Sequence, residues 1–64
     1  MEYYYKNQRC LEGQTRGRAN TLEEIKKLCD AEALQWKRQG FTGRYGIKIT
    51  AYYRTGKVVY EIWS

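Results

Sequence analysis

The chain has 64 residues, of which 42% are hydrophobic and none is proline. A chain of this size buries only about 60% of its unfolded surface, which argues for one small core and against a deep substrate cavity. Lysine and arginine number 12 against 7 acidic residues, so the net charge of +5 favours an anionic partner, either nucleic acid or an acidic protein face. We expect a single domain over residues 1–64.

Signals for a membrane, a cofactor or a metal are weak. No apolar run approaches the roughly 20 residues that span a bilayer, and Met1 is followed by Glu2 and three tyrosines rather than by a signal sequence. The sequence therefore predicts a cytoplasmic protein with no membrane partner. Cys10 and Cys29 are the only cysteines and histidine is absent, so no disulfide scaffold, no metal site and no cofactor are expected.

The N-terminal segment combines a tyrosine cluster with a loop that contains glycine and arginine. Residues 2–9 have the tyrosine density of a β-strand, and residues 12–20 contain turn-forming residues. The sequence predicts one strand here, and an additional short hairpin within residues 2–19 is the alternative.

Residues 21–39 carry the clearest local signal, and it predicts a helix. Thr21, followed three residues later by Glu24, forms a capping box, and Gly40 is placed to end the helix. Cys29 falls on the apolar side and is therefore expected to be a small core hydrophobe rather than a reactive thiol. The apolar face, which we expect to cover a sheet, comprises Leu22, Ile25, Cys29, Ala33 and Trp36, with Leu28 at its margin.

A hairpin is predicted near the C-terminus. Residues 47–54 and 57–63 are β-rich runs separated by Thr55 and Gly56. A two-residue loop keeps the apolar residues on one face, whereas a three-residue loop would mix the two faces. The predicted cross-strand pairs are Tyr53 with Val58, Ala51 with Tyr60, and Ile49 with Ile62.

These elements predict an α+β fold in the order β-α-β-β, with one helix packed on a mainly antiparallel three-stranded sheet. A right-handed crossover is expected to set the first strand parallel to the strand of residues 47–54. Residues 58–63 are apolar on both faces, so their strand is predicted to occupy the centre of the sheet.

Groups suited to catalysis are sparse. Histidine, the usual proton shuttle, is absent, and Ser64 is the only serine. Glu32 and Glu61 are expected to be solvated charges, on the helix flank and on the solvent side of the hairpin, rather than a catalytic pair. The chain is therefore predicted not to be an enzyme, and a minimal nuclease using arginines and carboxylates is the remaining enzymatic alternative.

One face of the predicted hairpin interleaves aromatic and basic residues. Proteins that bind single-stranded nucleic acid stack bases on aromatic rings and neutralise phosphates with lysine and arginine. The alternative is that the N-terminal tyrosines or a second copy of the chain cover this face. Its residues are Lys48, Thr50, Tyr52 and Arg54 on one strand, and Lys57, Val59, Glu61 and Trp63 on the other.

Two further features point to a partner. The loop of residues 13–18 offers two glycines and two guanidinium groups that can clamp a phosphate or a carboxylate, although an ordinary flexible basic loop is the alternative because the lysine of a P-loop is missing. Leu34, opposite the apolar stripe, is expected to be exposed and could anchor a partner. The predicted sites for a partner or nucleic acid are Arg16, Arg18, Arg44, Lys48, Tyr52, Arg54, Lys57 and Trp63.

The layout of a short strand region, a helix with a Thr-Leu start and a terminal hairpin resembles that of small phage-encoded proteins, among them some anti-CRISPR proteins. The resemblance implies a non-catalytic accessory protein that binds and inhibits a host nucleic-acid-handling complex, either a protein or a ribonucleoprotein. A direct nucleic-acid-binding module is the alternative, and a homodimer is compatible with both. The residues that carry the resemblance lie between positions 20 and 64: Thr21, Leu22, Lys26, Lys27, Gly43, Ile47, Ile49, Gly56 and Trp63.

Overall fold

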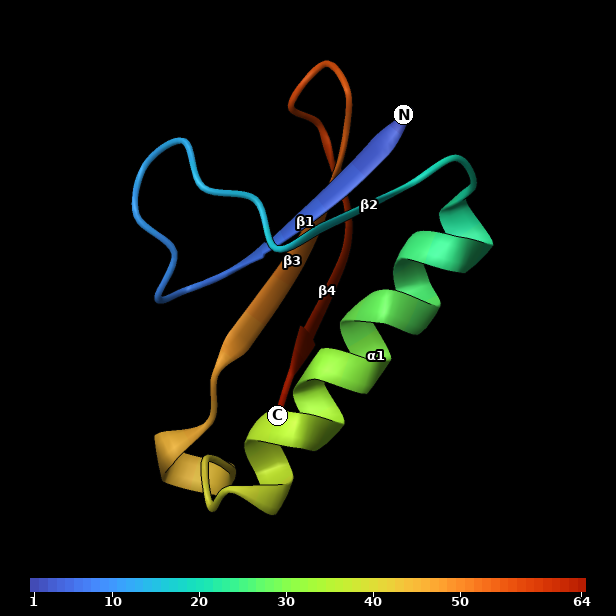
Figure 1. Cartoon of the computed structure of the whole chain (residues 1–64). Coiled ribbons are helices and arrows are strands. Elements are labelled where there is room, and N and C mark those ends of the chain that lie inside the picture. The colour runs from blue at the N-terminus through green and yellow to red at the C-terminus, as the bar shows by residue number, and fades with distance from the viewer.

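The computed structural model describes residues 1–64 as one antiparallel sheet with a single helix packed on it (Figure 1). The predicted α+β class is confirmed. The sheet has four strands rather than three, because the hairpin that was the alternative for residues 2–19 is formed. The elements are β1 (Tyr3–Asn7), β2 (Gly17–Ala19), α1 (Leu22–Arg38), the 3-10 helix η1 (Gly43–Tyr45), β3 (Lys48–Tyr53) and β4 (Val58–Trp63).

Both ends of α1 are set by local sequence. The Thr21 hydroxyl oxygen accepts a hydrogen bond from the Glu24 N–H at 3.2 Å, as expected of an N-cap. At the other end Gly40 has a φ of 94°, and the Phe41 N–H donates to the Trp36 carbonyl oxygen at 2.9 Å. The Phe41 and Trp36 rings also pack edge to face, with centroids 5.1 Å apart. This is a Schellman stop with its hydrophobic contact, so the predicted ends of the helix are confirmed.

The apolar face of α1 supplies the helical half of the core. Ile25 and Cys29 are fully buried, and Ala33 is 5% exposed. Leu22 and Trp36 are partly buried against the same cluster. The face predicted from the helical periodicity is therefore confirmed, and it covers the sheet as expected.

The predicted order of the strands is wrong. The sheet runs β2-β1-β3-β4, every neighbouring pair is antiparallel, and β3 rather than β4 lies inside the sheet. The reason is that β2, not β1, leads into α1. The helix therefore joins β2 to β3, which run parallel to each other with β1 inserted between them. Despite its apolar sequence, β4 is an edge strand.

The register of the β3–β4 hairpin agrees with the prediction only in the half that lies away from the turn. Ile49 pairs with Ile62 and Ala51 with Tyr60, but Val58 pairs with Tyr52 and not with Tyr53. The loop has three residues, because the Tyr53 N–H donates to the Lys57 carbonyl oxygen at 2.7 Å, and Gly56 takes a φ of 94°. A bulge at Val59 then restores the predicted pairing. Val59, which was predicted on the solvent side, therefore packs against the core, and Val58 lies on the opposite face in its place.

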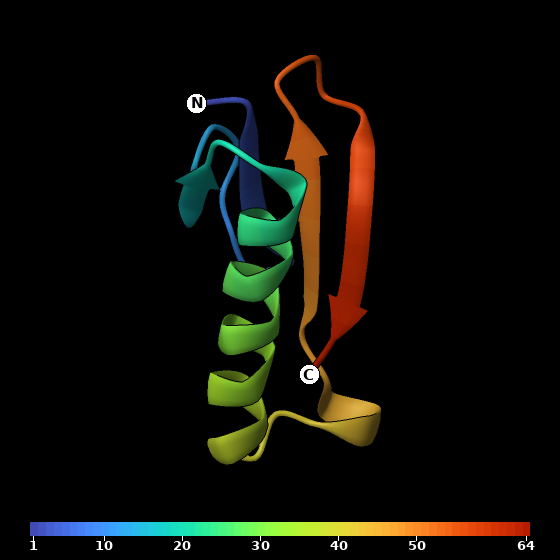
Figure 2. The same ribbon diagram turned by 90° about the vertical axis from the view of Figure 1, so that its right-hand side faces the viewer.

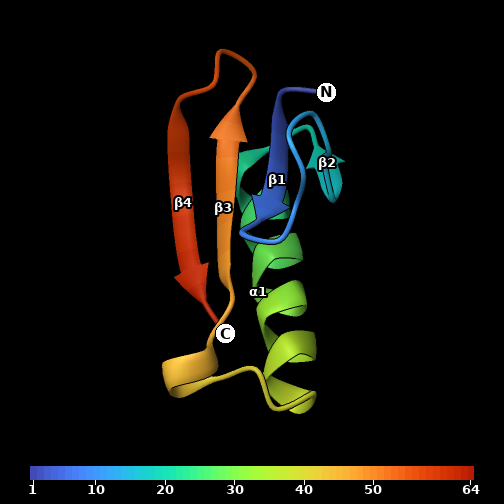
Figure 3. The same cartoon turned by 90° about the vertical axis from the view of Figure 1, so that its left-hand side faces the viewer.

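The two faces of the sheet differ in what covers them. Figure 2 shows α1 lying along one face, and Figure 3 shows the opposite face, with the loop between β1 and β2 passing in front of β1. The middle of this loop lies on the side of the sheet away from α1 (Figure 1), whereas the side chains of Arg9 and Arg16, near its two ends, reach the helix. Neither helical element has the length and apolarity needed to cross a membrane.

Candidate functional site

The sheet face that α1 leaves uncovered is called here the open face. Side chains alternate between the two faces along each strand, so the cross-strand pairs define its rows. The first row runs across all four strands, and the second and third rows lie toward the C-terminal end of β4. The rows are Arg18, Tyr4, Tyr52 and Val58; then Lys6, Thr50 and Glu61; then Lys48 and Trp63.

Two tyrosines form the aromatic centre of the open face. The rings of Tyr4 and Tyr52 are stacked, with centroids 5.1 Å apart and an interplanar angle of 18°. Both side chains are half-buried, so each keeps surface for a further contact. The Lys6 ammonium lies 6.0 Å from the centroid of the Tyr4 ring. An aromatic platform and a cation are thus adjacent on β1.

The cations of the open face differ in their partners. Lys48 pairs with Glu61 at 3.3 Å, and Arg54, in the turn next to this face, pairs with Glu2 at 3.5 Å, both in exposed positions. Such exposed pairs contribute about 0 to 1 kcal/mol each. Lys6 and Arg18 belong to none of the three ion pairs of the chain. The positive charge without an internal partner therefore lies on β1 and β2.

The predicted site residues are only partly brought together. Arg54 is the first residue of the three-residue turn and Lys57 follows it, while Arg44 lies in η1 at the opposite end of β3. Arg16 is held on the helix side of the sheet. The residues that do share the open face are Arg18, Lys48, Tyr52 and Trp63.

Sequence reasoning missed Tyr4 and Lys6, which complete the open face. It treated the N-terminal tyrosines only as a cover for the hairpin. The structure places Tyr4 against Tyr52 while both remain partly exposed. Three successive tyrosines carry no alternation in the sequence, so the burial of Tyr5 and Asn7 and the lesser burial of Tyr4 and Lys6 became visible only in the structure.

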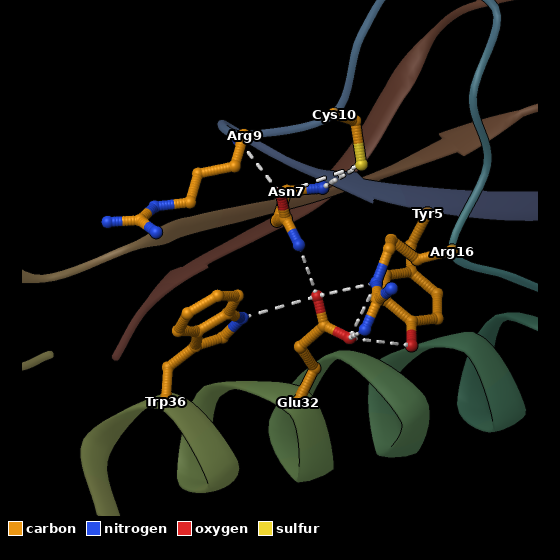
Figure 4. Close-up of polar contacts among 7 residues, drawn as sticks. All are labelled: Tyr5, Asn7, Arg9, Cys10, Arg16, Glu32 and Trp36. Carbon is orange, nitrogen blue, oxygen red and sulfur yellow. Dashed lines mark hydrogen bonds and ion pairs between the residues drawn. The ribbon is translucent and has the colours of Figure 1, made fainter. Parts of the chain in front are cut away.

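The largest correction concerns Glu32, which was expected to be a solvated charge on the helix flank. It is 5% exposed and accepts hydrogen bonds from four side chains (Figure 4). Asn7 Nδ2 donates to Oε2 at 2.7 Å and the Tyr5 hydroxyl to Oε1 at 3.2 Å. Arg16 adds an ion pair at 3.1 Å and the Trp36 indole N–H lies at 3.5 Å. We call these five residues the Glu32 cluster.

The charges of the Glu32 cluster compensate one another. Burial by itself raises the pKa of the Glu32 carboxyl, but the hydrogen bonds from Asn7 and Arg16 and the charge of Arg16 outweigh burial, so that pKa is lowered. The hydrogen bond to Glu32 likewise raises the pKa of Arg16. Burial, with the nearby Glu32 charge, raises the pKa of Tyr5 to about 12. The carboxylate is therefore ionised and fully bonded, and it joins α1 to β1 and to the following loop.

The chain after β1 is fastened to the same region. The Asn7 side-chain oxygen accepts the Arg9 N–H at 2.8 Å. The Arg9 guanidinium lies 5.3 Å from the ring centroid of Trp36 and 4.7 Å from that of Phe41. Cation–π contacts at such partly exposed sites contribute about 0.5 to 1 kcal/mol. The start of the β1–β2 loop is thus held against the end of α1.

The two thiols have different surroundings. Cys29 is fully buried, which confirms its place as a core hydrophobe, and burial is the main cause that raises its pKa to about 12. Cys10 is half-buried, its thiol contacts the Asn7 side-chain oxygen at 3.5 Å, and both cysteines are free. No group of three His, Cys, Asp or Glu side chains is placed to hold a metal ion.

Four open hollows of about 330 to 360 Å³ lie on the surface. Two of them are on the open face and share Lys6, one toward Arg18 and the other toward Lys48. A third adjoins the Glu32 cluster, and the fourth lies between α1 and β4. No protein-family model matches the chain, and no similar curated protein or solved structure was found.

Proposed function

We propose that the chain binds single-stranded nucleic acid on the open face. The observation that supports this proposal is the Tyr4–Tyr52 stack, beside which lie Lys6 and Arg18, two cations without an acidic partner. The part of a ring that stays exposed provides a surface for an unpaired base, and the neighbouring cations neutralise phosphate charge of the same strand.

The proposal specifies a single strand because stacking on a protein ring requires a base that is not enclosed in a duplex. Each base stacked on an aromatic side chain contributes about 1 to 3 kcal/mol. Each phosphate contact adds a salt-dependent contribution through counterion release. A sheet with one aromatic stack and two free cations supports modest affinity with little dependence on sequence.

The test is fluorescence anisotropy with labelled single-stranded DNA, single-stranded RNA and a duplex of the same sequence, at low and at physiological salt. Tyr52→Ala should weaken single-strand binding by about 1 to 3 kcal/mol. Tyr45→Ala is the matched control, because Tyr45 is 68% exposed in η1 and lies away from the open face. Equal losses in the two variants, or no binding at low salt, would reject the proposal.

A protein partner is a second candidate, and the hollow between α1 and β4 favours it. Its lining includes Leu34, Ile62 and Trp63, and the exposed fractions of Leu34 and Trp63 are 47% and 58%. Exposed apolar side chains around a hollow are typical of protein contacts. This surface is where the accessory, inhibitor-like role implied by the resemblance would be carried out.

Capture from a nuclease-treated bacterial lysate tests this second candidate. A nucleic-acid-handling protein that is retained by the wild-type chain and lost with Leu34→Asp supports it. Leu11→Asp is the control, since Leu11 is 71% exposed but lies in the β1–β2 loop outside this hollow. Recovery of no such protein counts against the inhibitor role.

A further inference from the structure

One hollow of the open face gathers more cations than any other hollow of the molecule. Its volume is about 330 Å³, close to the lower end of the size range of small-molecule sites. Three cations line it, against two in each of the hollows near Glu32 and Lys48 and one in the hollow beside Leu34. We call it the cationic hollow, and its lining is Met1, Tyr4, Lys6, Thr15, Arg18 and Arg54.

The charge balance of the cationic hollow exceeds what one phosphodiester needs. Arg54 is partly neutralised by Glu2, at 3.5 Å, whereas Lys6 and Arg18 have no acidic partner. The excess is therefore about two positive charges. A phosphodiester carries a single negative charge, while a phosphate monoester carries about 1.5 to 2 near neutral pH. The hollow thus matches a monoester better than an internal phosphate of a strand.

The groups that can bind phosphate are held by the fold rather than by flexible chain. Arg18 is the cross-strand neighbour of Tyr4, and β2 approaches so closely that a Cβ on Gly17 would lie 2.5 Å from the Tyr5 ring. Thr15 precedes Arg16, whose N–H donates to the Tyr5 carbonyl oxygen at 2.9 Å. A guanidinium group also presents its N–H donors in a planar fork that suits phosphate oxygens.

We infer that the cationic hollow binds the terminal phosphate monoester of a nucleic-acid strand whose adjoining base stacks on Tyr4 or Tyr52. This inference rests on the proposed function. It specifies the ligand class as a phosphorylated strand end, with Lys6 and Arg18 bonding the phosphate oxygens and Thr15 offering a hydroxyl donor.

The experiment compares one labelled single strand in three forms: with a 5′-phosphate, with a 3′-phosphate, and with hydroxyl groups at both ends. We expect one phosphorylated form to bind about tenfold more tightly than the unphosphorylated form, a difference of about 1.4 kcal/mol. Equal affinity for the three forms overturns the inference and leaves the proposed function intact. Absence of binding by all three overturns both.

Substitutions and a change of pH distinguish a specific site for the end phosphate from a nonspecific effect of the additional negative charge on the strand. Lys6→Gln with Arg18→Gln should remove the preference, whereas Lys48→Gln should weaken all three forms equally because Lys48 lies outside the cationic hollow. Lowering the pH from above to below about 6 protonates the monoester. The preference of the wild-type chain should then shrink. A preference that survives in the Lys6 and Arg18 variant, or that does not change with pH, contradicts the inference.

Discussion

The two faces of the sheet use the same types of residue for different purposes. On the helix side, tyrosine, arginine and glutamate meet in the Glu32 cluster, where Arg16 and Glu32 neutralise each other. On the open face, Tyr4 and Tyr52 stack beside cations that have no acidic partner. A buried charge has to be paired, because its desolvation penalty is several kcal/mol, whereas an exposed cation does not. The open face therefore keeps cations that can bind an external anion.

The helix side of the sheet is thus expected to contribute stability, and the open face is expected to contribute binding. Changes within the Glu32 cluster should lower the free energy of unfolding, whereas changes on the open face should alter binding with little effect on folding. Four measurements can distinguish these two roles.

Glu32→Ala should have the largest effect. It leaves the buried Asn7 amide and Tyr5 hydroxyl without their shared acceptor, and each unsatisfied buried group costs about 1 to 3 kcal/mol, whereas the half-exposed Arg16 guanidinium can be hydrated instead. Chemical denaturation followed by circular dichroism measures it. Lys27→Ala, at an exposed position of α1, should stay within about 0.5 kcal/mol of wild type. Similar losses in the two variants would show that Glu32 is not central to the fold.

Gly17→Ala should destabilise by about 1 to 3 kcal/mol, the usual cost of overpacking. The added methyl group would lie 2.5 Å from the ring of Tyr5, which cannot move freely because its hydroxyl donates to Glu32. The same denaturation measurement applies. Asn20→Ala, an exposed change just after β2, is the control and should be close to neutral. Equal stability of the two variants would mean that β2 can move away from β1.

Low pH should lower the stability of the wild-type protein because the Glu32 carboxylate becomes protonated. Its folded pKa is below the unfolded value of about 4.3, so the unfolded chain binds more protons and stability rises with pH in that region. The contribution is present above the unfolded pKa and is lost as pH falls through the folded pKa. Thermal unfolding followed from pH 7 downward should show this loss. Glu32→Gln should make the thermal stability less dependent on pH in the acid range. If the dependence is unchanged in this variant, it arises from other carboxyl groups.

Lys6→Gln with Arg18→Gln should have the smallest effect on folding, within about 0.5 kcal/mol, because neither residue forms an ion pair. The same variant should reduce the salt dependence of single-strand binding. Each lost phosphate contact lowers the slope of log K against log salt by about 0.7. Anisotropy across a salt series measures the slope. Lost stability together with an unchanged slope would reverse the roles assigned to the two faces.

The structure also changes which cations are worth testing. The sequence pointed to Lys48 and Arg54 because both lie on the exposed side of the hairpin. Each is already paired, with Glu61 and Glu2 respectively, so a charge swap there would also create like-charge contacts. Lys6 and Arg18 are better targets for substitution because neither has an acidic partner. Their place beside Tyr4 became visible only from the position of β1 and β2 in the sheet.

Local sequence signals were enough to predict the helix and the C-terminal hairpin. The Thr21 cap, the apolar periodicity and Gly40 define α1 through contacts between residues that lie no more than one or two helical turns apart. The alternation of residues 47–63 defines the hairpin and half of its register. Such signals act between near neighbours, so they can be recognised without knowing the rest of the fold.

The order of the strands and the burial of Glu32 depend on contacts between segments that are far apart in the chain. Which strand becomes central depends on pairing between segments more than 40 residues apart, such as Tyr4 with Tyr52, and the apolar sequence of β4 did not reveal its edge position. Glu32 is buried because Tyr5, Asn7 and Arg16 reach it from a distant part of the chain. A charge can be buried only where such partners converge, and that convergence is a property of the assembled sheet.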